Sequence, residues 1–300
     1  MTKLITGGTG LVGSAFRSGV KVSFKDYNLL SQVDTQRMLA DHQPKAVIHT
    51  AATVGGLGAN MTYPADFYYN NITMNTNVIE ECYQAGVQKL VCFLSTCVFP
   101  DKVEYPLDET KIHKGEPHPS NAPYAYAKRM ADVQVQAYNK QYGTEYFCVI
   151  PTNIYGPFDN FNLQNGHVIP MLVHKCYLAK RDNTAFEVWG SGKPLREFVY
   201  SQDLADIVDL LVEKYDGVDP VIISNPKEYS IKEVVDLIVK LMDFKGDVVW
   251  LDDKPDGQFR KPSSNKKLLS IIGSYNFTPL EVGLKNTIEW FNQNYSVARK

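Results

Sequence analysis

This sequence of 300 residues has no large excess of charge of one sign, no long hydrophobic run and no C-x-x-C cysteine pair. Lysine and arginine number 31 and aspartate and glutamate 33, so the formal net charge is −2. A chain without a basic excess has no bulk attraction for nucleic acid or for an anionic membrane surface. Its longest apolar runs, such as 89–93 and 208–212, are far shorter than the ~20 residues that span a bilayer. We therefore expect neither a nucleic-acid partner nor a membrane partner.

The cysteines are five in number and include no C-x-x-C pair; they are Cys82, Cys92, Cys97, Cys148 and Cys176. An odd count without that spacing argues against a disulfide framework and against a zinc ribbon. The opening residues lead directly into a strand-like run, with none of the apolar h-region that a signal peptide needs. These features predict a cytoplasmic protein with reduced cysteines and no metal site.

Apolar runs of strand length alternate with segments of helical periodicity along the chain. Strands are expected at Lys3–Thr6, Ala46–Thr50, Leu90–Ser95, Tyr146–Ile150 and Val221–Ile223. Helices are expected at Asn71–Ala85, Tyr124–Tyr142 and 203–215, and after Ser230, which forms a capping box with Glu233. This alternation predicts an α/β fold, a Rossmann-like doubly wound parallel sheet covered by helices.

Two stretches interrupt the alternation and suggest how the chain is divided. The polar segment Asp101–Pro123 has no periodicity, which is typical of a long functional or mobile surface loop. Around Pro157–Gly166 the composition shifts to Asn and Gly, yet no flexible linker separates two halves. We therefore predict a Rossmann domain of residues 1–158 and 197–225, with a smaller, discontinuous C-terminal substrate-binding lobe of residues 159–196 and 226–300.

A glycine-rich turn follows the first expected strand and precedes a helix. Gly7, Gly8, Gly10 and Gly13 fit both G-x-G-x-x-G and G-x-x-G-x-x-G. Such a turn lets the backbone approach a pyrophosphate and directs a helix N-terminus toward it. The motif alone is also compatible with a glycine-rich turn that binds nothing. Its strand–loop–helix setting favours a dinucleotide site.

The segment after this turn is short. Only residues 14–19 can be helical before Val20–Phe24 must form the second strand. Asp26 could bind a ribose 2′-hydroxyl, which would favour NAD. The candidates for pairing with a 2′-phosphate are Lys25, Lys21 and Arg17. The residues alone leave the choice between NAD and NADP open.

Tyr124 and Lys128 are spaced i, i+4 at the start of an expected helix, so their side chains share one face. A phenol has an ordinary pKa of about 10 and exchanges a proton at neutral pH only if a nearby cation lowers it. Ser95, at the end of a strand, lies where α/β sheets bind ligands. By itself Y-x-x-x-K is typical of an amphipathic helix with a solvated lysine. Combined with the glycine turn and Ser95, it predicts a catalytic site.

These motifs together resemble the extended short-chain dehydrogenase/reductase family, and the similarity extends from the first strand to the region of Trp290. The matching segments are Thr6–Gly13, His49–Ala52, Val54–Leu57, Tyr63–Asp66, Ser95–Pro100, Tyr124 with Lys128, Pro151–Asn153, Gly166–Pro170, Trp189–Gly192 and Arg196–Phe198. Several of them are specific to a branch that acts on GDP-sugars. The resemblance implies an NADPH-dependent enzyme that epimerises GDP-4-keto-6-deoxy-D-mannose at C3 and C5 and then reduces C4.

The resemblance also implies a role for each matching position. Cys97 and His167 would be the acid–base pair of epimerisation, since both side chains can titrate near neutrality. Ser95, Tyr124 and Lys128 would reduce C4, and the other four cysteines would be packing residues. The implied cofactor-binding residues are Gly7, Gly10, Leu11, Val12, Gly13, Lys25, Ala51, Ala52, Phe93, Leu94, Lys128, Pro151, Thr152, Asn153, Ile154 and His167. The implied GDP-sugar contacts are Lys175, Trp189, Arg196 and Asp256.

Two alternatives accompany this interpretation. One is a single-function epimerase or 4-reductase of the same family, and a plain 4-reductase would need neither Cys97 nor His167. The other is a non-catalytic NADP-sensing protein, a class that typically lacks the tyrosine–lysine pair retained here. The family typically forms homodimers, so the helices at 71–85 and 124–142 are expected to pack into a four-helix interface.

Overall fold

The main sheet of the computed structural model, which describes residues 2–254, 256 and 258–300, is parallel throughout. Its strands, in spatial order, are β2 (Val20–Val22), β1 (Lys3–Thr6), β3 (Ala46–His49), β4 (Lys89–Phe93), β5 (Glu145–Pro151) and β9 (Val221–Ile223). The chain leaves β1 toward one edge and returns at β3 on its other side. Ligands bind in such sheets where the strand order reverses in this way.

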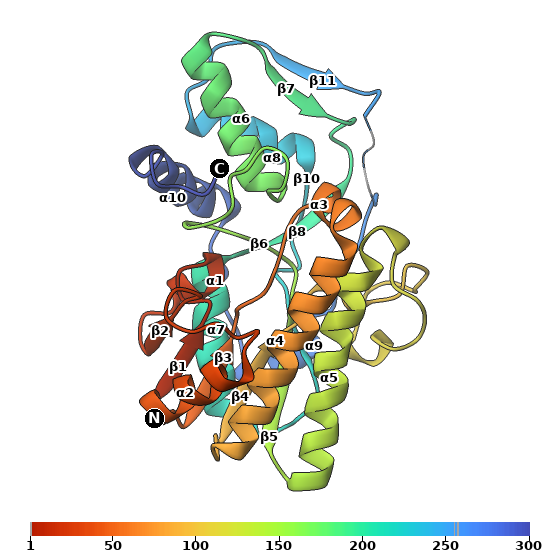
Figure 1. The fold of residues 1–300 in the computed structure, drawn as a ribbon. Helices are drawn as coiled ribbons and strands as arrows, with labels where there is room; N and C mark the ends of the chain where they lie inside the picture. Colours follow the sequence, from red (N-terminus) through yellow and green to blue (C-terminus); the bar gives the residue numbers. More distant parts are fainter. Residues whose placement is uncertain (1, 255, 257) are drawn as a thin grey trace.

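Helices cover both faces of this sheet. On one face lie α2 (Gln32–His42), α4 (Pro64–Gln84) and α5 (Ala122–Tyr142), which share a core with Leu4, Leu90 and Ile150. On the other lie α1 (Leu11–Ala15), α7 (Ser201–Lys214) and α9 (Lys266–Ile272), packed on Ile5 and Val149. The long helices α4 and α5 run side by side (Figure 1). The predicted doubly wound α/β fold is confirmed.

A second group of elements lies at the carboxyl end of the sheet, at the top of Figure 1. It contains α6 (Val168–Asp182), α8 (Ile231–Leu241), α10 (Leu280–Gln293) and the parallel pair β7 (Phe186–Trp189) and β11 (Val248–Leu251). A three-stranded sheet of β10 (Glu228–Ser230), β8 (Leu195–Tyr200) and β6 (Asn153–Tyr155) joins it to the main sheet. Aromatic residues such as Phe161, Phe186 and Phe291 fill its core. We propose that this group is the smaller lobe.

Several predicted boundaries are corrected by the structure. The first helix occupies Leu11–Ala15 rather than residues 14–19, because Phe16 already has extended backbone and Gly19, at φ 107°, turns the chain into β2. That strand ends at Val22 instead of Phe24. Helix α4 begins at Pro64, since proline suits the first helical turn, and not at Asn71. The predicted 101–123 loop contains short 3-10 turns at Glu109–Lys111 and Pro119–Asn121, and it ends at Asn121 because α5 begins at Ala122 rather than at Tyr124.

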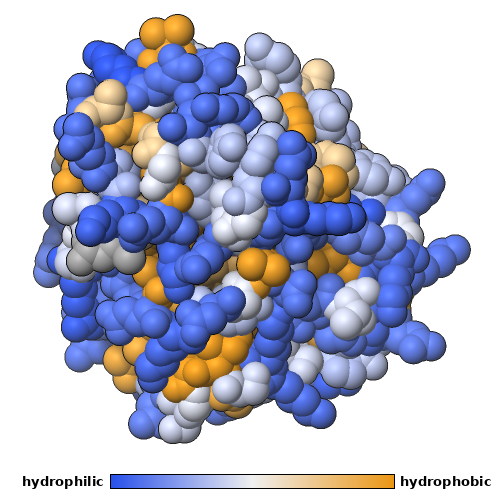
Figure 2. Space-filling model, turned by 90° about the horizontal axis from the view of Figure 1, so that it is seen from below, coloured by the Kyte–Doolittle hydropathy of each residue, from blue (hydrophilic) through white to orange (hydrophobic). Residues whose placement is uncertain are grey.

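Within the described part of the chain, no helix combines the length and the apolar character needed to cross a bilayer. Figure 2 shows one face of the molecule, seen from below the view of Figure 1. Hydrophobic side chains gather there in small groups that hydrophilic ones separate. Such small apolar groups are ordinary for a protein surface.

Candidate active site

A cavity of about 1170 Å³ opens at the carboxyl ends of the main-sheet strands. Residues directly at or after the ends of β1, β3, β4 and β5 contribute to its wall, among them Thr6, Thr50 and Leu94. The opposite wall comes from the second group of elements, including His167 and Arg196. The cavity therefore lies between the two groups, where open α/β sheets place their ligands.

The glycine turn forms one end of the cavity. Gly7 has φ 68°, a left-handed conformation that favours glycine, and its carbonyl accepts the Gly10 N–H at 2.9 Å. A Cβ on Gly7 would lie 2.8 Å from the Ala51 nitrogen, and one on Gly13 would lie 2.3 Å from the Gly7 oxygen. The turn is therefore as tight as close approach of a pyrophosphate requires, so these residues fit a dinucleotide. Gly13 packs behind the turn and does not line the cavity.

We expect Gly13→Ala to weaken dinucleotide binding at least about tenfold and to lower the melting temperature. The added methyl group would press on the Gly7 carbonyl, and the backbone there must shift to accept it. Fluorescence titration and thermal unfolding measure the two effects. Gly58→Ala is the matched control, because its Cβ would have only the Gln164 oxygen nearby, at 3.8 Å. Unchanged affinity in Gly13→Ala would contradict the assigned role of the turn.

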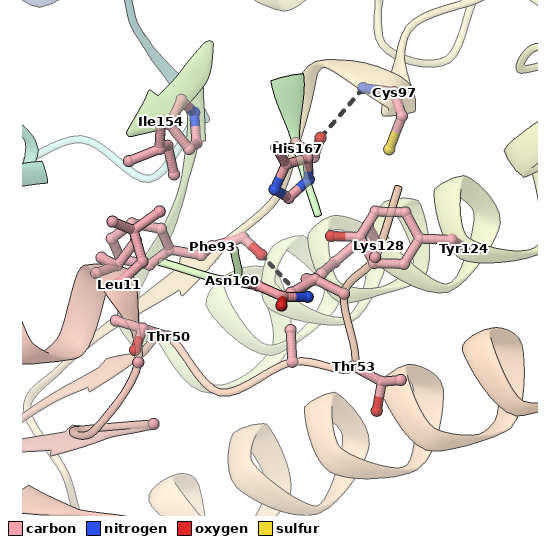
Figure 3. Close-up of a pocket in the computed structure, with 18 of the residues that line it drawn as sticks. Leu11, Thr50, Thr53, Phe93, Cys97, Tyr124, Lys128, Ile154, Asn160 and His167 are labelled. Carbon is pink, nitrogen blue, oxygen red and sulfur yellow. Dashed lines mark hydrogen bonds between the residues drawn. The ribbon is translucent and has the colours of Figure 1, made fainter. Parts of the chain in front are cut away.

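Lys128 and Tyr124 project from α5 into the cavity beside the end of β4 (Figure 3). The Lys128 ammonium donates to the Phe93 carbonyl at 2.9 Å and lies 6.0 Å from the centroid of the Tyr124 ring. Burial lowers the pKa of Lys128 to about 8. Burial, together with the charge of Cys97, raises the pKa of Tyr124 above its ordinary value. This direction is opposite to the predicted one, because the phenol is desolvated and the Lys128 ammonium is hydrogen-bonded to the Phe93 carbonyl.

Cys97 and His167 face the same space from different elements (Figure 3). Cys97 lies in a 3-10 turn, Thr96–Val98, which Ser95 caps by accepting the Cys97 N–H at 3.4 Å. Burial raises the pKa of its thiol, although the hydrogen bond with Ser95 and the charge of Lys261 oppose the shift. His167 precedes α6, and burial lowers its pKa. Both groups are therefore neutral at pH 7, so the imidazole can accept a proton and the thiol can donate one.

Most of the predicted site residues meet in this cavity. They are Gly7, Gly10, Leu11, Val12, Ala51, Ala52, Phe93, Leu94, Ser95, Cys97, Tyr124, Lys128, Pro151, Thr152, Asn153, Ile154, His167 and Arg196. Lys25 is exposed and does not line it, although Ser23 and Phe24 do. Asp26 is engaged in the same turn, where its Oδ2 accepts the Ser23 N–H and hydroxyl, each at 2.8 Å.

The three remaining predicted residues lie outside the cavity wall, in the second group of elements. The Lys175 ammonium lies 4.8 Å from the centroid of the exposed Trp189 ring, a cation–π contact. Asp256 accepts the N–H and hydroxyl of Ser191, each at 2.7 Å. The charge of Asp256 also acts on the guanidinium of Arg196, which does line the cavity.

Sequence reasoning missed several polar residues of the wall, namely Asn121, Asp159, Asn160, Lys261 and Arg299. Lys261 donates to the Thr96 carbonyl at 2.8 Å, one residue before Cys97. No spacing in the sequence predicts that the segment around Lys261 contacts the segment around Cys97. The 157–166 stretch, which carries Asp159 and Asn160, shows in the sequence only a shift toward Asn and Gly.

Comparison with known proteins matches residues 15–229 to the model of the NAD-dependent epimerase/dehydratase family. The chain is 46% identical over 312 residues to a GDP-L-fucose synthase of Dictyostelium discoideum, covering 100% of this chain and 98% of that protein. It is 36% identical to the Escherichia coli K12 GDP-L-fucose synthase, covering 97% and 96%. A Naegleria fowleri GDP-L-fucose synthetase structure bound to NADP superposes with a TM-score of 0.95 at 42% identity, covering 100% and 95%.

Proposed function

Because the chain belongs to the NAD-dependent epimerase/dehydratase family, alongside the GDP-L-fucose synthases, we propose that it converts GDP-4-keto-6-deoxy-D-mannose to GDP-L-fucose with NADPH. One observation carries the proposal. The acid–base pair Cys97 and His167 lines the same cavity as Ser95, Tyr124 and Lys128. A plain 4-reductase would need only the latter three groups, and a sensor would need no proton donor.

Epimerisation uses the acidity that the 4-keto group gives to the hydrogens at C3 and C5. Inverting each carbon needs a proton removed from one face and another delivered to the opposite face. Cys97 and His167, which enter the cavity from different elements, supply this pair. Ser95 and Tyr124 hydrogen-bond the ketone oxygen and stabilise the negative charge that develops on it.

Reduction of C4 uses the same oxygen. Bound NADPH supplies the hydride. Tyr124 gives its proton to the developing alkoxide while Ser95 holds the oxygen. Lys128, whose pKa is about 8, is mostly protonated at pH 7 and stabilises the tyrosinate left behind. One set of groups thus serves both steps on a single ketone.

The cofactor and the nucleotide of the substrate take separate parts of the site in this proposal. The glycine turn, Ala51, Ala52 and residues 151–154 hold the dinucleotide. Arg196, whose guanidinium suits a pyrophosphate, binds the GDP-sugar with Lys175, Trp189 and Asp256. Lys25 pairs with the 2′-phosphate. The exposed position of Lys25 and the engagement of Asp26 with Ser23 support that choice.

We also propose that two copies associate through α4 and α5 as a four-helix interface. These helices carry several exposed aromatic or apolar residues, namely Tyr68, Tyr69, Tyr126, Val133 and Tyr142. The proposed interface would bury these side chains, and aromatic residues are enriched at protein–protein interfaces. A cytoplasmic location is proposed as well, and the five free cysteines support it.

The proposed function is tested by incubating the protein with GDP-4-keto-6-deoxy-D-mannose and either NADPH or NADH. We expect NADPH absorbance to fall and GDP-L-fucose to form, with a much slower reaction in NADH. Nuclear magnetic resonance identifies the sugar. An absence of NADPH oxidation would refute the reductase, and a 4-reduced sugar with unchanged C3 and C5 would favour the single-function alternative. Comparable rates with NADH would show that Lys25 does not select a 2′-phosphate.

A further inference from the structure

One carboxylate in the cavity wall is buried with an oxygen that has no partner. Asp159 is only 3% exposed and lies in the segment between β6 and α6. Its Oδ1 accepts the N–H of Asn160 at 2.7 Å. Its Oδ2 is buried and makes no hydrogen bond to any residue that the structure describes. An unsatisfied buried polar atom is costly and calls for a physical explanation.

The other carboxylates of the wall differ from Asp159. Within the described residues they are Asp101 and Glu197. Asp101 is exposed to solvent, so water satisfies it. Glu197 is buried, but its two oxygens accept the N–H and the hydroxyl of Ser263. Asp159 is thus the buried carboxylate of this wall that still offers an acceptor.

Residues near the end of the printed sequence hold the Asp159 segment in place. The Phe161 N–H donates to the Arg299 carbonyl at 2.7 Å, and the Arg299 guanidinium donates to the Phe158 carbonyl at 2.6 Å. Burial raises the pKa of Asp159 to about 7, and the charge of Arg299 opposes the rise. A substantial fraction of the carboxylate is therefore ionised at neutral pH. In that form it can only accept hydrogen bonds.

We propose that Asp159 Oδ2 accepts a hydrogen bond from a ring hydroxyl of a bound sugar, either the hexose of the GDP-sugar or the ribose of the dinucleotide. The choice of these ligands rests on the proposed function. A carboxylate would repel their pyrophosphates, so it must face a neutral donor. The same segment runs on to His167, and Asn160 and His167 both line the cavity with Asp159. Sugar hydroxyls are the donors that both ligands bring to this part of the cavity.

Equilibrium binding tests the proposal without turnover. Calorimetry with NADPH and, separately, with GDP-L-fucose gives two dissociation constants for the wild type, Asp159→Ala and Asp159→Asn. We expect Asp159→Ala to weaken one ligand at least about tenfold, the loss typical of a hydrogen bond to a charged group, and the other less than about threefold. The affected ligand identifies which ring is held. Asp236→Asn, a change at an exposed carboxylate of α8 outside the cavity wall, is expected to leave both constants unchanged.

Asp159→Asn separates binding from a purely structural role. The amide oxygen can still accept the Asn160 N–H, so the turn and the melting temperature are expected to be kept while ligand affinity falls. Wild-type affinities in Asp159→Asn would show that the carboxylate serves only the turn. Unchanged constants in Asp159→Ala would also overturn the proposal. A wild type that binds both ligands but does not oxidise NADPH would instead contradict the proposed function. The dissociation constants of the Asp159 variants would still show whether this carboxylate binds a sugar.

Discussion

Cys97→Ser is expected to slow exchange of the C3 and C5 hydrogens with solvent by about 10²–10⁴-fold, the usual contribution of a positioned acid or base. The hydroxyl is close in size to the thiol, but its pKa is far too high for it to take part as an acid or a base. NADPH affinity is expected to stay within about twofold, because the variant keeps the shape of the wall. Incubation of GDP-4-keto-6-deoxy-D-mannose in deuterium oxide with NADP⁺ present, followed by mass spectrometry, measures the exchange.

The exchange should also depend on pH in a direction that the structure fixes. Burial raises the pKa of the Cys97 thiol, so its thiolate fraction is small at neutrality and grows as pH rises. A step in which the thiol donates a proton therefore slows on the alkaline side in the wild type, as thiolate replaces thiol, and Cys97→Ser loses that limb. Cys176→Ala, at a buried thiol in α6, is the control for removing a cysteine. Deuterium entering both carbons at the wild-type rate in Cys97→Ser would disprove the assignment.

The main sheet could be predicted because its signals are local. Parallel strands covered on both faces are short, nearly continuous apolar runs, and all six predicted strands, Val20–Phe24 included, are present within one or two residues of the expected ends. The helix after Ser230 is present too, with the predicted capping box to Glu233. Elements β7, β8 and α6 were not predicted. Strand β7 alternates over only four residues, and α6 opens on a continuous apolar run, 168–173, whose pattern does not distinguish a helix from a strand.

The candidate catalytic groups could be predicted from local motifs, whereas the rest of the cavity wall could not. Ser95, Tyr124 and Lys128 belong to short motifs whose spacing is set within one strand end or one helix. Asp159 is buried with one carboxylate oxygen unpaired, and this arrangement depends on the hydrogen bonds between Arg299 and the segment before α6. The raised pKa of Tyr124 likewise depends on burial, which the i, i+4 spacing does not report. Local pattern therefore identifies the candidate catalytic groups, and tertiary packing decides their protonation.

Tyr124→Phe is expected to reduce the rate of NADPH oxidation by at least about 10²-fold while exchange at C3 and C5 persists at a reduced rate. In the proposed mechanism the phenol is the proton donor to the C4 alkoxide, and phenylalanine keeps the ring but removes that proton. Burial also raises the pKa of Tyr124, so the hydroxyl stays protonated throughout the neutral range. Stopped-flow absorbance measures the reduction, and deuterium incorporation in the same variant measures the exchange.

Tyr126→Phe provides a matched control from the same helix. Tyr126 lies two residues further along α5, is 37% exposed and packs against Arg129 rather than lining the cavity. Both rates are expected to stay within about twofold, because phenylalanine keeps the ring that the proposed helix interface would bury, and the hydroxyl that is lost belongs to a residue outside the cavity wall. If Tyr124→Phe reduced the ketone at the wild-type rate, another group would have to protonate the alkoxide. The neutral thiol of Cys97 would then be the next donor to test, because it faces the same oxygen-binding groups and its raised pKa keeps it protonated at pH 7.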